Sequence, residues 1–141
     1  MLKILVLSLI LVGCGSDEKS SKRHVDEPLK KHVDLFYETF QLAPTCSAYL
    51  DHDVRFGAKL WGLSVKGNYI KINIATYPNM SQLSREALVF HELAHCERSL
   101  RHDNRIDEYD NAVSLMSPTI DFEAYHSNRD YYIFELKRKM R

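Results

Sequence analysis

The strongest constraint on the fold of this chain is a pair of histidines inside an apolar segment. Residues 87–96 are apolar on nearly every side, apart from His91, Glu92 and His95. A helix that is apolar all round is a buried helix, so its polar side chains need partners inside the protein. Helical residues turn by about 100° each, so His91 and His95 project within about 40° of each other, one turn apart. Both imidazoles can therefore bind one metal ion.

Glu92 completes the pattern His-Glu-Leu-Ala-His, which is typical of zinc peptidases. On the same helix Glu92 lies about 60° from His95, beside the metal but outside its ligand set. A carboxylate at that place can take a proton from a zinc-bound water, whose pKa the metal lowers to about 7. We expect His91 and His95 to bind Zn²⁺ and Glu92 to act as the catalytic base.

A catalytic zinc ion needs a third protein ligand and one open position. His102 is the nearest candidate, but on an unbroken helix it would lie about 16 Å from His91. The helix is therefore expected to end near Arg98 or Ser99, where the chain must reverse. Asp103 could then support the ligand that precedes it.

Residues 91–118 resemble the metzincins, the metallopeptidase clan with HExxHxxGxxH followed by a Met-turn. The resemblance rests on His91-Glu92-Leu93-Ala94-His95, His102 and Ser114-Leu115-Met116-Ser117-Pro118. It implies an α+β, zincin-type fold with a small twisted sheet, an active-site helix, a Met-turn and a C-terminal helix. It also implies that Met116 lies beneath the zinc ligands, and that Pro118 belongs to the pocket for the substrate residue after the scissile bond.

Two positions depart from the metzincin pattern. Arg98 stands where the clan has the Gly that turns the chain, and His102 comes one residue later than the clan's third ligand. A left-handed turn at a residue other than Gly costs about 1–2 kcal/mol, which a fold tolerates. The alternative is a gluzincin-type site, in which Glu108 or Glu123 would be the third ligand.

The N-terminus is typical of an exported bacterial lipoprotein. Residues 4–12 form an apolar run too short to span a bilayer, and Leu11-Val12-Gly13-Cys14 resembles a lipobox. We expect residues 1–13 to be the signal peptide and Cys14 to carry the lipid, including palmitate. Residues 14–26 would form a flexible tether before a catalytic domain at 27–141. Gly15 after the lipidated residue favours the outer membrane, facing the periplasm or the exterior.

Cys46 and Cys96 remain for an oxidising compartment if Cys14 is lipidated. They could form one disulfide, and two separate buried thiols are the alternative. Nineteen Lys and Arg balance nineteen Asp and Glu, so the chain lacks the basic excess of a nucleic-acid-binding protein.

Hydrophobic periodicity and turn residues predict the other elements. They are a helix over 28–41, a strand at 54–56, a hairpin of 63–65 with 69–75, and a C-terminal helix over 127–141 whose basic end is solvated. Lys71 and Asn73 alternate with isoleucines, which favours 69–75 as an edge strand that pairs with substrate.

Together these features predict a lipid-anchored zinc endopeptidase whose substrate is a peptide or protein. A zinc-binding envelope lipoprotein without catalytic activity is the alternative from another functional class.

Overall fold

The computed structural model describes residues 23–52 and 61–141. Within these ranges the protein is α+β, with a three-stranded mixed sheet and four α-helices. The helices are α1 (Glu27–Phe40), α2 (Gln82–Arg98), α3 (Phe122–Ser127) and α4 (Arg129–Lys139). The strands are β1 (Ser47–Asp51), β2 (Gly62–Val65) and β3 (Tyr69–Asn73). The expected signal peptide, Cys14 and the expected strand at 54–56 lie outside the described residues.

β3 is the central strand of this sheet, whose order is β1-β3-β2. It pairs in parallel with β1 and antiparallel with β2. The expectation that 69–75 forms an edge strand is therefore wrong. The alternation of isoleucines with Lys71 and Asn73 reports which face of the strand is packed, whereas its place in the sheet depends on which backbone groups find partners. Of the two edge strands of the described sheet, β2 is the one that packs against α2.

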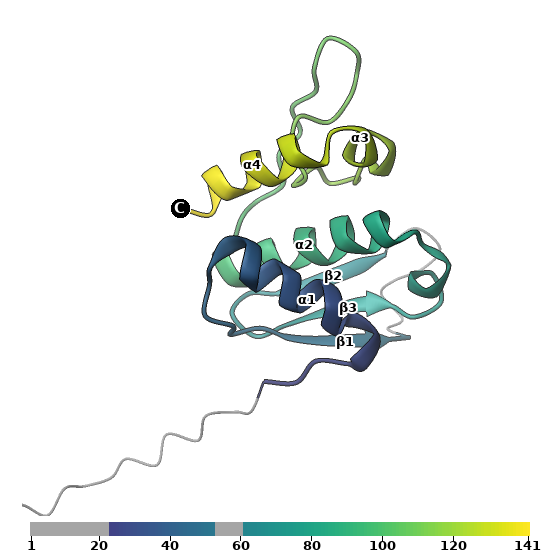
Figure 1. Ribbon diagram of the computed structural model, residues 1–141, viewed down its shortest axis with the longest axis vertical. Helices are drawn as coiled ribbons and strands as arrows, with labels where there is room; N and C mark the ends of the chain where they lie inside the picture. The colour runs from purple at the N-terminus through teal and green to yellow at the C-terminus, as the bar shows by residue number, and fades with distance from the viewer. Residues whose placement is uncertain (1–22, 53–60) are drawn as a thin grey trace, which may run out of the picture.

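The core lies between the sheet and two helices. α1 and α2 lie side by side across one face of the sheet (Figure 1). Phe36 and Phe40 of α1 contact Phe90 of α2, with ring centroids 5.3 and 5.6 Å apart. On the sheet side, Ile70 and Ile72 of β3 are fully buried. α2 is thus a buried helix, as its sequence predicts.

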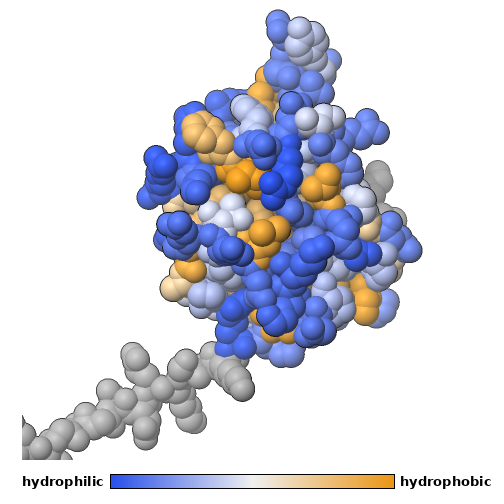
Figure 2. All heavy atoms as spheres, in the orientation of Figure 1, coloured by the Kyte–Doolittle hydropathy of each residue, from blue (hydrophilic) through white to orange (hydrophobic). Residues whose placement is uncertain are grey.

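α3 packs on α2 and is followed by α4. α4 confirms the C-terminal helix expected over 127–141, whereas α3 was not expected. The helices α3 and α4 meet at Asn128, and Asp121 caps α3 by accepting a hydrogen bond from the Ala124 amide. The segment before them projects from the body as a long loop (Figure 1), closed by a bridge between Ile106 and Ala112. The face shown in Figure 2, which has the orientation of Figure 1, is mostly hydrophilic, with small apolar areas near its centre.

Residues 24–26, which the sequence assigns to the end of the tether, lie against β1. The Ala48 amide donates to the His24 carbonyl at 2.8 Å, and the Asp26 amide donates to the Ala48 carbonyl at 3.0 Å. The ordered domain therefore includes these residues, which lead directly into α1.

Candidate metal centre

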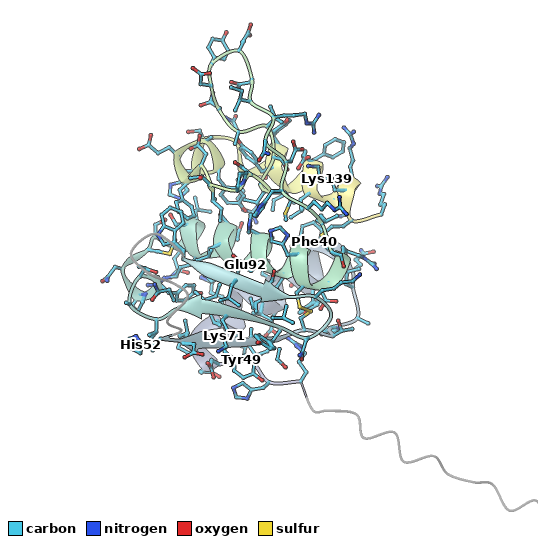
Figure 3. All side chains as sticks on the ribbon, turned by 180° about the vertical axis from the view of Figure 1, so that it is seen from behind. Phe40, Tyr49, His52, Lys71, Glu92 and Lys139 are labelled. Atoms are coloured by element: carbon cyan, nitrogen blue, oxygen red, sulfur yellow. A yellow bond between two sulfur atoms is a disulfide. The ribbon has the colours of Figure 1, made fainter. Side chains whose placement is uncertain are left out.

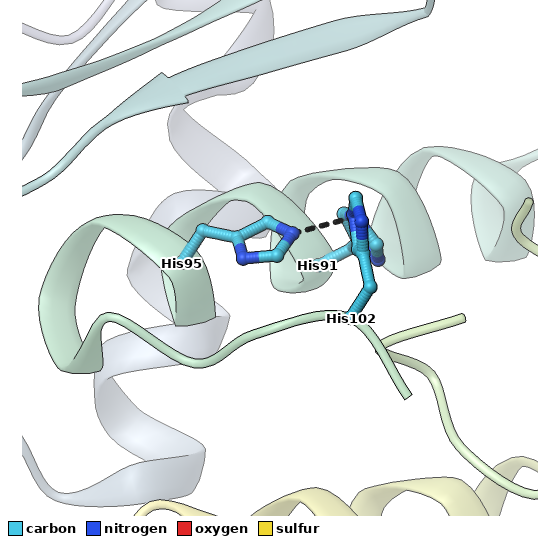
Figure 4. A group of neighbouring side chains, drawn as sticks. All are labelled: His91, His95 and His102. Carbon is cyan, nitrogen blue, oxygen red and sulfur yellow. Dashed lines mark hydrogen bonds between the residues drawn. The ribbon is translucent and has the colours of Figure 1, made fainter. Parts of the chain in front are cut away.

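Three histidine side chains converge on one side of α2. His91 and His95 project from the same helix face, and their Nε2 atoms lie 3.0 Å apart (Figure 4). The ring centroid of His102 lies 5.4 Å from that of His91 and 4.7 Å from that of His95. One ring nitrogen of each residue lies within 4.8 Å of the others, and among the described residues this is the only such group that could hold a metal ion. Glu108 and Glu123 are not part of it, so the geometry favours His102 over either carboxylate.

The helix ends where the third histidine requires it to end. α2 stops at Arg98, and Ser99 follows in the left-handed conformation with a φ of 55°. The Ser99 amide donates to the His95 carbonyl at 2.9 Å, which closes the last turn. The chain then reverses and carries His102 back to the other two histidines (Figure 4), as the sequence predicts.

Backbone carbonyls determine which nitrogen of each buried imidazole carries the proton. Nδ1 of His91 donates to the Leu115 carbonyl at 2.8 Å, and Nδ1 of His95 donates to the Leu100 carbonyl. A neutral imidazole has one N–H group, so each Nε2 keeps a free lone pair. Two lone pairs 3.0 Å apart repel each other unless a cation binds both. In a tetrahedral site with Zn–N distances of 2.0–2.1 Å, the ligand nitrogens are about 3.3 Å apart, so the donor set fits zinc.

Burial keeps the two helix imidazoles neutral. It lowers the pKa of His91 to about 3 and also lowers the pKa of His95. A metal ion binds neutral imidazole, so the environment of both side chains favours the form that a ligand needs.

Glu92 lies beside the histidines, and its carboxyl group is almost completely buried. Burial raises the pKa of this carboxyl to about 8, and a hydrogen bond from Ser64 acts in the opposite direction. Gly62 of β2 packs directly on the carboxyl group, since a Cβ atom at this position would lie 2.7 Å from Oε1. Figure 3 shows Glu92 where α2 faces the sheet. Gly62 thus makes room for the one buried carboxyl group next to the histidines, a contact that the sequence did not reveal.

A cavity of about 660 Å³ joins the histidines to the edge strand. Its lining includes Trp61 with residues 62–64 of β2, and a second segment, Pro118, Thr119 and Ile120. Leu88 contributes from α2, together with the polar side chains of the centre. A mostly apolar cavity with a few convergent polar groups is typical of a ligand-binding site.

The segment before Pro118 supports two of the histidines through its backbone. Met116 is fully buried, and its carbonyl accepts a hydrogen bond from the Asp103 amide at 2.8 Å. The preceding carbonyl, of Leu115, accepts the hydrogen bond from His91. Sequence reasoning missed Leu115 because a backbone carbonyl leaves no signal in the residue type.

Lys139 of α4 connects the C-terminal helix to the same segment (Figure 3). Its ammonium group donates to Asp103 at 2.5 Å and to the hydroxyl of Ser114 at 2.9 Å, and it pairs with Glu135 at 2.9 Å. The Arg105 guanidinium and then Lys139 hold the pKa of the Asp103 carboxyl well below its usual range. The expectation that the basic end of the chain is wholly solvated is therefore wrong for Lys139, which binds the residue next to His102.

Cys46 and Cys96 form a disulfide, which confirms the bonded alternative. The bond joins the start of the sheet to α2, one residue after His95. Glu97 reinforces the connection, because its carboxylate accepts hydrogen bonds from the amides of Thr45 and Cys46 at 3.1 and 2.9 Å.

Comparisons with protein-family models, with curated proteins and with solved structures find no match to this chain. The chemistry of the site is therefore the basis for a functional assignment. That chemistry combines three imidazoles, a buried carboxyl group and an edge strand around one cavity.

Proposed function

We propose that this protein is a zinc-dependent peptidase. The observation that carries the proposal is the convergence of three histidines, His91, His95 and His102, next to Glu92 in one cavity. Three protein ligands leave one position of a tetrahedral ion open, which is the arrangement of catalytic zinc sites. A zinc ion held there would supply a Lewis acid that activates water and polarises a peptide carbonyl.

Glu92 would move the protons of the reaction. As a general base its carboxylate takes a proton from the attacking water, and as a general acid it delivers that proton to the leaving amine. Gly62 and Ser64 hold the carboxyl group against β2, so it stays within reach of a peptide bond in the cavity.

β2 would bind the substrate through the backbone edge that faces away from β3, where no described strand pairs with it. The Asn73 amide donates to the Trp61 carbonyl at 2.8 Å, and the backbone groups of successive strand residues point to opposite sides. The amides and carbonyls of Gly62 and Ser64 therefore point away from β3. An extended peptide can pair with such an edge as an added strand. The substrate strand thus lies along 62–65 and not along 69–75.

The resemblance to the metzincins supports the same assignment, and we propose that the fold is metzincin-like. The left-handed residue is Ser99, one position after Arg98, and His102 follows it at the clan's interval of three residues. The extra residue is thus absorbed by the helix, and the spacing from the turn to the third histidine is kept. Met116 is buried, as expected of the clan's Met-turn, and we propose that Pro118 borders the pocket for the residue after the scissile bond.

The variant Glu92→Gln tests the proposed function. We expect the parent protein to bind zinc and to hydrolyse an unstructured protein, and a chelator to abolish the activity. Glu92→Gln should bind the same amount of zinc and lose about 1,000-fold in kcat, since it loses the general base. Zinc content is measured by elemental analysis and cleavage by mass spectrometry. If the zinc-loaded parent cleaves nothing in a broad peptide library, a non-catalytic zinc-binding function replaces the peptidase.

We also propose that the protein is an envelope lipoprotein anchored through Cys14. No helix among the described residues is long and apolar enough to cross a membrane. Attachment through acyl chains would follow from the lipobox, with each buried CH₂ contributing about 0.8 kcal/mol. Expression with a palmitate analogue should label the parent and not Cys14→Ser, and fractionation should find the parent in the outer membrane. Equal labelling of both proteins would contradict the proposal.

A further inference from the structure

Trp61, which lines the cavity, is in contact with the aromatic ring of Phe122, two residues after the lining residue Ile120. Trp61 immediately precedes β2, and Phe122 is the first residue of α3. Their ring centroids lie 4.9 Å apart with an angle of 41° between the planes, which is direct contact. The contact thus joins the strand side of the cavity to the chain that follows Pro118, Thr119 and Ile120.

The contact between Trp61 and Phe122 lies toward the N-terminal half of α2, on the side of His91 where Glu86 lies. α3 packs on the first half of α2, where the Tyr125 hydroxyl donates to Glu86 at 2.6 Å. β2 runs in the same direction as α2, because Gly62 lies against Glu92 and the Gly67 amide donates to the Cys96 carbonyl at 2.8 Å. The start of β2, and Trp61 with it, therefore lies on the Glu86 side of the histidines.

An extended peptide cannot pass between the two rings. Neighbouring strands lie about 4.7–4.9 Å apart and packed sheets about 10 Å apart, so a peptide between two walls needs roughly twice the distance that separates these rings. Among the described residues, the two rings therefore close the space along β2 at Trp61. Gly62 lies beside Glu92 and Trp61 is the next residue toward this end, so at about 3.4 Å per residue only one or two substrate residues fit between the reacting bond and the rings.

The direction of the substrate decides which of its ends meets this barrier. Antiparallel pairing is the more stable arrangement, and β2 already pairs in this way with β3. A substrate antiparallel to β2 runs from Val65 toward Trp61. The residues after the scissile bond then meet the aromatic pair, and those before it extend toward Val65.

We propose that the contact between Trp61 and Phe122 restricts this protein to peptide bonds one or two residues from the carboxyl end of its substrate. The inference rests on the proposed peptidase function. Under this inference the protein trims free C-terminal segments and does not cleave long chains internally. Its substrate class is unstructured peptides with an accessible carboxyl end.

A peptide series with one fixed cleavage sequence tests the inference. The peptides keep the same residues before the scissile bond and carry one, two, four or six residues after it, with free and amidated ends. The zinc-loaded protein should lose about 100-fold in kcat/KM between two and four residues, because the longer chain is displaced from the site. Amidation should not restore cleavage, since the barrier is steric. Lengthening the peptides before the scissile bond should not reduce kcat/KM.

The variant Phe122→Ala separates this barrier from other effects of length. It should raise the ratio of kcat/KM for the six-residue extension to that for the one-residue extension by about 10-fold, because it opens the end of the cavity. Phe134→Ala is the matched control, since Phe134 is an exposed aromatic side chain on α4. This control should keep the parent's ratio, and circular dichroism checks that both variants fold.

The other outcomes contradict the barrier, the direction of the substrate or the peptidase function. If the parent cleaves all lengths equally and Glu92→Gln cleaves none, the barrier is wrong and the peptidase stands. If only lengthening before the scissile bond reduces the rate, the substrate runs in the opposite direction and the inference fails. If the ratio for Phe122→Ala equals that of the parent, the aromatic pair is not the barrier. If no peptide of any length is cleaved, both the inference and the proposed function are wrong.

Discussion

At the scale of single residues, Gly62 and Leu115 give the candidate site its geometry although neither contributes a side-chain ligand. Gly62 lacks a side chain, so β2 approaches α2 closely enough to pack on the Glu92 carboxyl group. The Leu115 carbonyl accepts the Nδ1 proton of His91 and so leaves Nε2 directed toward the other two histidines. Such partners orient catalytic side chains and ligands, and their loss is expected to impair the site although the ligands remain.

Gly62→Ala should lower kcat/KM by about 100-fold, since the added methyl group displaces the Glu92 carboxyl group and small displacements have effects of this size. Zinc content should stay at the parent level, because the three histidines do not contact the methyl group directly. Elemental analysis and peptide hydrolysis measure the two quantities.

Gly67→Ala is the control for a glycine substitution in the same hairpin. Gly67 has a φ of 65° with nothing within 4 Å of an added Cβ, so this variant should lose about 1–2 kcal/mol of stability through backbone strain. Its activity per folded molecule should equal that of the parent. Full activity in Gly62→Ala at full zinc content would show that packing against Gly62 does not position Glu92.

At the scale of elements, α2 is fixed at both ends. Near its start, Glu86 accepts hydrogen bonds from Tyr125 and Arg129, both at 2.6 Å. Near its end, Cys96 is bonded to Cys46, 50 residues earlier in the sequence. Closing a loop of this length stabilises the folded state by about 4 kcal/mol through the entropy of the unfolded chain. The helix that carries two of the proposed ligands is therefore rigid between the sheet and the C-terminal helices.

Lys139→Met should weaken zinc binding about 10-fold, since mutations of the groups that support metal ligands have effects of this size. The ammonium group of Lys139 binds Asp103 and Ser114. Asp103 directly follows His102, and Ser114 lies two residues before Met116. Competition with a chromophoric chelator measures the zinc affinity. Lys137→Met is the control, because Lys137 is an exposed lysine of the same helix. Lys139→Arg should recover part of the affinity, and an unchanged affinity in Lys139→Met would contradict the connection.

At the scale of the whole molecule, the candidate metal centre joins two parts of the chain. His91 and His95 belong to the part built from the sheet, α1 and α2, whereas His102 belongs to the chain that leads to α3 and α4. A metal ion bound by all three histidines would link these parts and stabilise the folded protein, because the assembled site exists only in that state.

Zinc should raise the free energy of unfolding by about 4 kcal/mol at a free concentration of roughly 1,000 times its Kd. His102→Ala should lose most of this gain, whereas Glu123→Ala should keep it, because Glu123 lies outside the histidine group. Thermal unfolding with and without zinc measures the effect. A gain that is kept in His102→Ala and lost in Glu123→Ala would establish the gluzincin-type ligand set instead.

The sequence by itself determined the local features of this protein. The spacing of His91, Glu92 and His95 and the apolar residues around them predicted a buried helix with a two-histidine face, which is α2. The need to bring His102 back predicted the end of the helix near Ser99. These features follow from helix periodicity, which acts over a few neighbouring residues.

Only the tertiary structure decided which strand is central in the described sheet, which residue packs on Glu92 and which ring Trp61 contacts. Side-chain alternation describes the faces of a strand and not its neighbours, so 69–75 could not be recognised as the central strand. The contacts of Glu92 with Gly62, of Trp61 with Phe122 and of Lys139 with Asp103 join residues 30 to 61 positions apart. Such pairs depend on how the elements pack together, and packing is a property of the whole chain.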